Sequence, residues 1–307
     1  MKILINRKPV DGPWGGGNLF VKAFCELLRE KGHTVVHELS SDLDVIFMQD
    51  PRYSELGISI NEIASYKRQK PSTLVLHRVN ECDARKGTED MDQLLQASSE
   101  YVDTTIFVSN WMKNYHMSRG WKCSDARVLY NGVEKRHFQP REKSSKIDNG
   151  KINLVTHHWS NNRMKGFDVY EALDEFVGKN NDFTFTYIGR ALDTFKNTEL
   201  VKPTFGADLG EKLSMFDVYI SGSLFDPGPN HILESLACEI PTYAYKDGGG
   251  ACEFVGESHT YNSIEELTNI LLGKKFKIND LMPDDWETCI DGYYRVLVES
   301  FYKHSPS

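Results

Sequence analysis

Short β-rich segments alternate with helical patterns along most of the sequence, and this alternation limits the possible folds more than any other feature. Strand candidates in the first half are residues 2–6, 34–38, 44–49, 73–79, 104–109 and 127–130. Helical patterns at residues 19–31 and 111–119 end beside Gly32 and Gly120, as helices often do. Strands that alternate with helices form parallel sheets covered by helices, so we expect an α/β fold.

The alternation stops at residues 134–150, a polar and charged segment typical of a linker, and then starts again. Strands are predicted at residues 152–159, 183–188, 218–221 and 242–245, and helices at 167–177, 209–215, 231–238, 264–272 and 285–302. We therefore expect two Rossmann-like domains that face each other across a cleft. In such domains ligands bind at the carboxyl ends of the strands.

Composition narrows the classes of function. The 44 acidic and 36 basic residues leave a net charge of -8, which disfavours a broad nucleic-acid-binding surface. The six cysteines contain no C-x-x-C pair, so neither a zinc site nor a disulfide framework is predicted. The N-terminus has no apolar signal segment and no stretch is long enough to span a membrane, so we expect a cytoplasmic protein. The sequence is equally compatible with peripheral membrane contact.

A glycine run, Gly15-Gly16-Gly17, follows the first strand and opens the first helix. Glycines allow a ligand to approach the backbone, and a helix N-terminus favours an anion. A flexible turn explains the run equally well. The run is not G-x-G-x-x-G, which disfavours a nicotinamide dehydrogenase.

Polar residues also follow the strand at 73–79, where active-site residues gather in such folds. His77 is a candidate site residue, although a lone histidine more often has a structural role. For Arg78 and Glu81, the alternative to a role in the site is a surface ion pair.

A polar loop at residues 156–166 lies between a predicted strand and a predicted helix. Arg163 and Lys165, close to the start of that helix, are placed to hold a diphosphate. The alternative is a solvated basic loop. His157 and His158 are too isolated from other ligands to suggest a metal site.

The segment 221–234 carries the strongest signal, because a strand ends there in a turn of glycine and prolines before a helix. Asn230 is a suitable N-cap, which would leave the amides of His231 and Ile232 free to bind phosphate. Glu234 then lies one turn into the helix, where its carboxylate can accept hydrogen bonds from ribose hydroxyls. Asp226 precedes it on the turn and faces the same cleft. A capped helix with two solvated carboxylates is the alternative.

A further glycine-rich turn, which contains Gly249 and Gly250, follows the strand at 242–245 and supports a ligand site at this edge. Asp42 and Asp44 have the spacing of a D-x-D metal motif, but they lead into a strand of the first half. We interpret them as accidental and predict no metal ligands.

These residues resemble the retaining glycosyltransferases of family 4, which have the two-domain GT-B fold. The family's E-x7-E motif corresponds to Asp226 and Glu234, and the following Ser-Leu-Ala-Cys-Glu-Ile-Pro is similar to its E-A-x-A-C-G-x-P. Lys165 and Gly166 are similar to the family's K-G pair. Gly249-Gly250 with the later glutamate, and the Asn-Gly-Val run at 131–133, also match.

The resemblance implies transfer of a sugar from a nucleotide-diphospho-sugar to a sugar, lipid-linked or other hydroxyl acceptor, with retention and without a metal or cofactor. It implies an acceptor-side domain of residues 1–137, completed by a returning C-terminal helix at 286–307, and a donor-binding domain of residues 138–285.

In that scheme Glu234 holds the ribose, and Lys165 with Arg163 and the helix start near His231 neutralises the diphosphate. Asp226 and, from the other domain, His77 contact the donor sugar. The loop of Gly16 and Gly17 leaves room for phosphate and acceptor.

The sequence departs from the family at two positions. Asp226 stands where the family has glutamate, and Ser160 stands where it has the diphosphate arginine, which Arg163 would replace. A nucleotide-sugar epimerase of the same architecture and a non-catalytic nucleotide-sugar-binding protein are the alternative functions.

Overall fold

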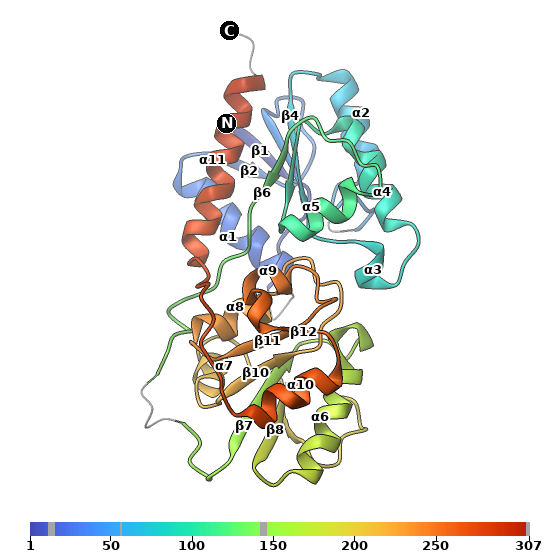
Figure 1. Ribbon diagram of the computed structural model, residues 1–307. Helices are drawn as coiled ribbons and strands as arrows, with labels where there is room; N and C mark the ends of the chain where they lie inside the picture. The colour runs from blue at the N-terminus through green and yellow to red at the C-terminus, as the bar shows by residue number, and fades with distance from the viewer. Residues whose placement is uncertain (12–15, 56, 142–145, 305–307) are drawn as a thin grey trace. The chain divides into compact units, whose positions relative to one another are not determined.

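The computed structural model describes residues 1–11, 16–55, 57–141 and 146–304 of the chain (Figure 1). Two compact units are present: Met1–Asn131 with Glu287–Ser307, and Gly132–Trp286. The sequence had suggested boundaries at 137/138 and 285/286. Gly15 and residues 305–307 of the predicted C-terminal helix lie outside the described residues.

The first unit contains a six-stranded sheet in the order β2-β1-β3-β4-β5-β6, in which every neighbouring pair of strands is parallel. Its strands are β1 (Lys2–Ile5), β2 (Thr34–Val36), β3 (Val45–Met48), β4 (Leu74–Val79), β5 (Thr104–Phe107) and β6 (Ala126–Val128). Its helices are α1 (Gly16–Glu30), α2 (Ile60–Gln69), α3 (Asp83–Lys86), α4 (Met91–Ser98), η1 (Ser99–Tyr101), α5 (Asn110–Met117) and most of α11 (Trp286–His304).

The second unit contains a parallel six-stranded sheet in the order β12-β11-β10-β7-β8-β9. Its strands are β7 (Ile152–His158), β8 (Phe183–Gly189), β9 (Glu199–Val201), β10 (Val218–Ser221), β11 (Thr242–Tyr245) and β12 (Thr260–Tyr261). Its helices are η3 (Arg163–Lys165), α6 (Phe167–Lys179), α7 (Gly206–Leu213), α8 (Asn230–Ala237), α9 (Ala251–Val255), η4 (Glu257–His259) and α10 (Ile264–Gly273).

Both sheets have the doubly wound topology. The first strand of each unit lies inside its sheet, β1 between β2 and β3, and β7 between β8 and β10. The chain therefore reverses its direction of growth beside β1 and again beside β7, which creates the crevice where ligands bind in such sheets. This confirms the predicted fold class of two Rossmann-like α/β units.

Helix α11, apart from Trp286, belongs to the first unit. The Tyr293 ring on α11 packs edge-on against Phe20 of α1, with centroids 4.7 Å apart. The buried guanidinium of Arg78 on β4 lies 4.2 Å from the centre of the Phe20 ring and donates from Nε to the Tyr293 hydroxyl at 3.1 Å. Its Nη2 donates to the side-chain oxygen of Asn131 at 2.7 Å. Arg78 is therefore a structural residue, and the surface ion pair that its charge suggested is not present.

The polar segment at 134–150 is more closely tied to the second unit than a linker would be. Phe138 is buried in a core cluster together with residues of α7 and α8. Just before the segment, the backbone of Val133 donates to Asp284 at 3.1 Å and accepts from Trp286 at 2.9 Å. Residues 142–145 lie outside the described range.

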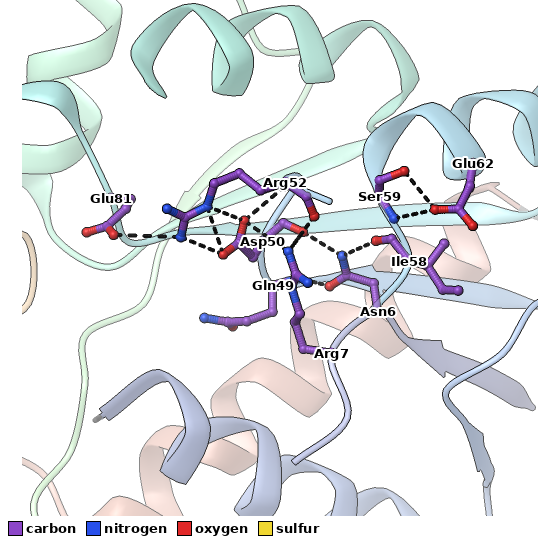
Figure 2. Close-up of polar contacts among 9 residues, drawn as sticks. All are labelled: Asn6, Arg7, Gln49, Asp50, Arg52, Ile58, Ser59, Glu62 and Glu81. Carbon is purple, nitrogen blue, oxygen red and sulfur yellow. Dashed lines mark hydrogen bonds and ion pairs between the residues drawn. The ribbon is translucent and has the colours of Figure 1, made fainter. Parts of the chain in front are cut away.

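Several short elements were missed from the sequence: α2, α3, α4, α9, β9 and β12. For α2 a signal was available, because Ser59 and Glu62 have the spacing of a capping box. The Glu62 carboxylate accepts from the backbone N–H of Ser59 at 2.9 Å (Figure 2).

Candidate functional site

Three loops meet at the carboxyl ends of β7, β10 and β11, which are neighbouring strands of the second sheet. The N–H of Leu224, after β10, donates to the carbonyl of Met164, after β7, at 2.9 Å. The N–H of Phe225 donates to the carbonyl of Asp247, after β11, at 2.7 Å, and that of Gly250 donates to the carbonyl of Asp226 at 2.8 Å. These backbone bonds join the loops after β7, β10 and β11, three segments that are well separated in the sequence.

Glycine is required where the loops cross. Gly166 has a φ of 97°, and a Cβ there would lie 2.1 Å from the carbonyl carbon of Gly222. Gly249 has a φ of 72°, and its Cβ would lie 2.7 Å from backbone atoms of Asp226. Any other residue would push the loops apart. Phe225 also has a positive φ, 48°, a conformation that side chains other than glycine seldom adopt and that is frequent at functional sites.

The crossing brings Asp226 and Lys165 together. The Lys165 ammonium lies 3.5 Å from a carboxylate oxygen of Asp226, and the hydroxyl of Ser223 lies 3.5 Å from the same oxygen. Asp226 is buried and Lys165 is partly buried. A lysine held in this way carries a positive charge into the site, where it can meet an anionic ligand.

Glu234, on α8, is held by a residue of β7. One of its carboxylate oxygens lies 2.7 Å from Nε2 of His157. The other ring nitrogen of His157 lies 3.1 Å from the hydroxyl of Tyr219, on β10. Burial raises the pKa of Tyr219 well above its usual value, so this hydroxyl stays protonated. Glu234 keeps partial exposure and therefore remains accessible to a ligand.

His158 and His231 make their own contacts beside this pair. His158 Nε2 lies 2.6 Å from the Tyr170 hydroxyl, and His231 Nε2 lies 2.8 Å from the hydroxyl of Ser221. The two imidazole rings are 4.8 Å apart. Within the described ranges no group of three or more His, Cys, Asp or Glu side chains is placed to hold a metal ion.

The start of α8 differs from the prediction. The helix begins at Asn230, the cap position is Pro229, and no side chain caps the helix. The N–H of Ile232, expected to be free for phosphate, donates to the carbonyl of Pro229 at 3.0 Å. The carbonyl at a cap position accepts the first bonds of its helix, so the N–H of Ile232 is not available to a ligand. Ile232 is therefore a buried core residue in this structure.

The basic loop before α6 is partly engaged in surface contacts. Arg163 forms ion pairs with Asp168 and, at 3.2 Å, with Glu171, and its side chain is 57% exposed. The Ser160 hydroxyl accepts from the N–H of Asn162 at 3.2 Å. Arg163 would have to exchange its carboxylate partners for a phosphate in order to act as predicted.

In the first unit, His77 occupies an interior position of β4. Its side chain has 0% exposure, and both ring nitrogens are buried without a hydrogen-bond partner. Burial lowers the pKa of His77 to about 3, so the ring is neutral. His77 therefore does not reach the surface, and the predicted contact with a donor sugar is not available in this conformation.

The carboxyl edge of the first sheet carries charged residues, of which Glu81 was singled out from the sequence but Asp50, Arg52 and Arg7 were not (Figure 2). The Asp50 carboxylate, after β3, accepts from Arg52 at 2.7 Å and lies 3.3 Å from Nη2 of Arg7. Burial raises the pKa of Asp50, but hydrogen bonds and charge from Arg52 outweigh it, and the net shift is downward. Glu81, after β4, lies 3.2 Å from Nζ of Lys86, and burial raises its pKa. The signal for this cluster in the sequence was a polar residue directly after each of these strands.

Gly16 and Gly17 begin α1 at the same edge. A Cβ on Gly17 would lie 3.5 Å from the side-chain nitrogen of Gln49 and 3.8 Å from that of Asn80. Gln49 is buried, with its side-chain oxygen unpartnered, and in Figure 2 it points away from Asn6 and Arg7. Amide donors therefore lie beside the helix start that was predicted to leave room for a phosphate.

The described architecture is that of the GT-B glycosyltransferases. Sucrose-phosphate synthase from Thermosynechococcus elongatus matches with a TM-score of 0.70 at 13% identity, over 99% of this chain and 100% of that one. Anabaena HepE in complex with UDP-glucose matches with a TM-score of 0.67 at 14% identity, over 97% of this chain and 100% of that one. At such identities the likeness shows the fold.

A UDP-forming alpha,alpha-trehalose-phosphate synthase from Burkholderia vietnamiensis matches with a TM-score of 0.62 at 11% identity, over 95% of this chain and 79% of that one. No family model and no curated protein matches the sequence. None of the helices in the described ranges is both long enough and apolar enough to span a membrane.

Proposed function

We propose that this chain is a glycosyltransferase that moves a sugar from a nucleotide-diphospho-sugar to an acceptor hydroxyl, with retention of the anomeric configuration and without a metal. One observation carries the proposal. A cation, Lys165, and a carboxylate, Glu234, lie on one carboxyl edge of a doubly wound sheet, beside the strand at which the sheet reverses. These two charges complement a diphosphate and a ribose, the parts shared by all such donors.

The proposed roles follow from the contacts. Glu234, held by His157, accepts hydrogen bonds from the ribose hydroxyls. Lys165 turns from Asp226 toward the diphosphate, which is the stronger anion. Asp226, now released, accepts a hydrogen bond from a donor-sugar hydroxyl. The start of α8 at Asn230 and His231 adds the positive end of a helix dipole.

In the proposed transfer, the bond between the anomeric carbon and the diphosphate oxygen breaks, and its electron pair leaves with the diphosphate. The acceptor oxygen bonds to the anomeric carbon on the same face, and its proton passes to the departing phosphate oxygen. Negative charge therefore develops on the diphosphate, where Lys165 stabilises it. Arg163, Ser160, Gly249 and Gly250 border the donor in this scheme.

The first unit supplies the acceptor side in this proposal. Gly16 and Gly17, beside the amides of Gln49 and Asn80, leave space for a phosphate or the acceptor. HepE has been solved with UDP and with UDP-glucose, so uridine donors are the first to test. We expect the reaction to take place in the cytoplasm, with peripheral membrane contact where the acceptor is lipid-linked.

The test begins with thermal-shift measurements against UDP-, GDP-, ADP- and CMP-sugars, followed by measurement of nucleotide release and product linkage with saccharide acceptors. Lys165→Ala is expected to weaken binding of the nucleoside diphosphate, while Lys179→Ala, at an exposed lysine paired with Glu175, leaves it unchanged. An unchanged affinity in Lys165→Ala would refute the role of Lys165. Epimer formation from donor alone would replace the transferase by an epimerase. Donor binding without any turnover would favour a binding protein.

A further inference from the structure

The chain that follows α10 carries a group of exposed apolar side chains. Among the described residues thirteen large hydrophobic side chains are exposed, and four of them lie within residues 272–282, at and after the end of α10 (Figure 1). They are Leu272, Ile278, Leu281 and Met282, which are 53%, 51%, 41% and 45% exposed. We call residues 272–282 the connector segment. Neighbouring exposed apolar side chains, unlike single ones, indicate a surface that binds a partner.

The connector segment is also positively charged. It contains Lys274, Lys275 and Lys277 against one acidic residue, Asp280, so it carries a charge of +2 in a chain whose net charge is -8. Lys274 donates to the carboxylate of Asp182 at 2.6 Å. Lys275 and Lys277 are exposed, and within the ranges that the structure describes neither forms an ion pair. Two ammonium groups are therefore available to an anionic partner.

The backbone of the connector segment is fixed to the second unit. Asn279 is buried, and its Nδ2 donates to the carbonyls of Thr242 at 2.9 Å and Val255 at 3.0 Å. Its side-chain oxygen accepts from the N–H of Thr242 at 2.9 Å. Nε2 of His259 lies 2.8 Å from the carbonyl of Lys277. These contacts hold the middle of the segment against the unit, so its outward side chains form a defined surface.

The combination of lysines with apolar side chains favours a membrane over a protein partner. Lysine is depleted from protein–protein interfaces, and a symmetric contact with a second copy would bring the same lysines against one another. The boundary of an anionic bilayer accepts both kinds of side chain. Apolar side chains enter the edge of the acyl region, while the lysine ammonium groups stay at the lipid phosphates.

We propose that the connector segment binds the surface of an anionic membrane. Lys275 and Lys277 contact the lipid headgroups, and Ile278, Leu281 and Met282 enter the boundary of the acyl chains. The inference goes beyond the proposed transfer reaction, because it concerns where the protein binds a membrane and not what it does to a sugar. It stands on the surface of the second unit alone.

The experiment measures cosedimentation of the protein with phosphatidylcholine vesicles that contain or lack phosphatidylserine, without donor or acceptor. The unchanged protein is expected to bind the vesicles that contain phosphatidylserine. Raising the ionic strength from about 0.1 M to about 1 M shortens the screening length from about 10 Å to about 3 Å and should weaken this binding.

Two double variants test the two kinds of side chain. Lys275→Gln with Lys277→Gln is expected to weaken vesicle binding about 30-fold, the effect of two lysines at an anionic surface. Ile278→Ser with Leu281→Ser should weaken it about 10- to 100-fold, since each residue loses roughly half the transfer free energy of a buried aliphatic side chain. All four side chains are exposed, so thermal unfolding should be unchanged.

A matched control comes from the same unit. Leu200 and Lys202 are an exposed leucine and an exposed lysine outside the connector segment, and Leu200→Ser with Lys202→Gln should leave vesicle binding unchanged. An equal loss in this control would show that the binding has no specific location and would refute the inference.

The other outcomes are equally decisive. Failure of the unchanged protein to bind phosphatidylserine vesicles, or binding that survives both double variants in the connector segment, would refute the inference. If those variants change the sedimentation of the protein in the absence of vesicles, the segment is an interface between copies, and the inference is overturned. Calorimetry with UDP is a separate measurement. A protein that binds vesicles but no nucleotide would leave the inference standing while the proposed function fails.

Discussion

Nε2 of His157 lies 2.7 Å from the Glu234 carboxylate, and Nδ1 of the same ring lies 3.1 Å from the Tyr219 hydroxyl. The carboxylate can only accept, so Nε2 donates to it, and the Tyr219 hydroxyl holds the other side of the ring. The three side chains belong to α8, β7 and β10. A ligand of Glu234 therefore meets a carboxylate that is already oriented.

This relationship predicts the effects of two substitutions on nucleotide affinity. Glu234→Ala is expected to weaken UDP binding by about 1.5–3 kcal/mol, the usual contribution of hydrogen bonds to a charged group. His157→Gln, which keeps a donor, is expected to have a smaller effect than His157→Ala. Titration calorimetry measures both, with Glu257→Ala at an exposed carboxylate as the control. Equal affinity in Glu234→Ala would show that Glu234 does not contact the ligand.

Arg78→Met is expected to destabilise the first unit. The substitution keeps an unbranched side chain in the buried space, but it removes the bonds to Tyr293 and Asn131. The free energy of unfolding should fall by about 1.5–3 kcal/mol for each bond that water cannot replace. Urea unfolding measures the change. Arg295→Ala, at an exposed residue of α11 paired with Asp291, should change it little.

Glu239→Gly is expected to stabilise the second unit. Glu239 is exposed, follows α8 and has a φ of 54°, in the left-handed region that favours glycine. Relief of the backbone conformation outweighs the greater freedom of glycine in the unfolded chain, for a net gain of about 1 kcal/mol. Thermal unfolding checks this. Lys275→Gly, at an exposed residue without a positive φ, should instead lose stability, and a loss in both variants would contradict the argument.

His77 predicts a dependence of stability on pH. Burial lowers its pKa from 6.5 to about 3, so between these values the unfolded chain binds a proton that the folded chain does not. Unfolding therefore becomes easier as pH falls below 6.5, by up to about 1.4 kcal/mol per pH unit. His77→Phe should reduce the slope of unfolding free energy against pH between 6.5 and 5. His137→Gln, at an exposed histidine, should not, and equal slopes in all three proteins would show that His77 is not buried as described.

The fold could be predicted because its strands are short apolar runs that end in turn residues. Residues 218–221 and 242–245 were placed on β10 and β11 with their observed bounds. Elements such as β12, with two residues, are too short to show a period, and they depend on pairing with distant strands. Helix α2 could have been predicted from its capping residues.

The site could be predicted only in part. Turns that need glycine can be recognised in a sequence. Three such turns, after β7, β10 and β11, are joined by backbone hydrogen bonds in the structure. A sequence does not show that a central strand is buried on both faces. His77 was therefore predicted to contact a ligand, whereas its side chain is completely buried on β4. Nor does the sequence reveal that residues 77 positions apart, His157 and Glu234, form a pair.

The docking of α11 has a consequence for synthesis on the ribosome. Residues 132–286 leave the ribosome before residues 287–304, so the second unit can complete its fold while the first still lacks a helix. Until Tyr293 emerges, Arg78 has neither its hydroxyl acceptor nor one of its aromatic neighbours. The unit that is translated first can therefore be the unit that is completed last, when α11 packs against α1.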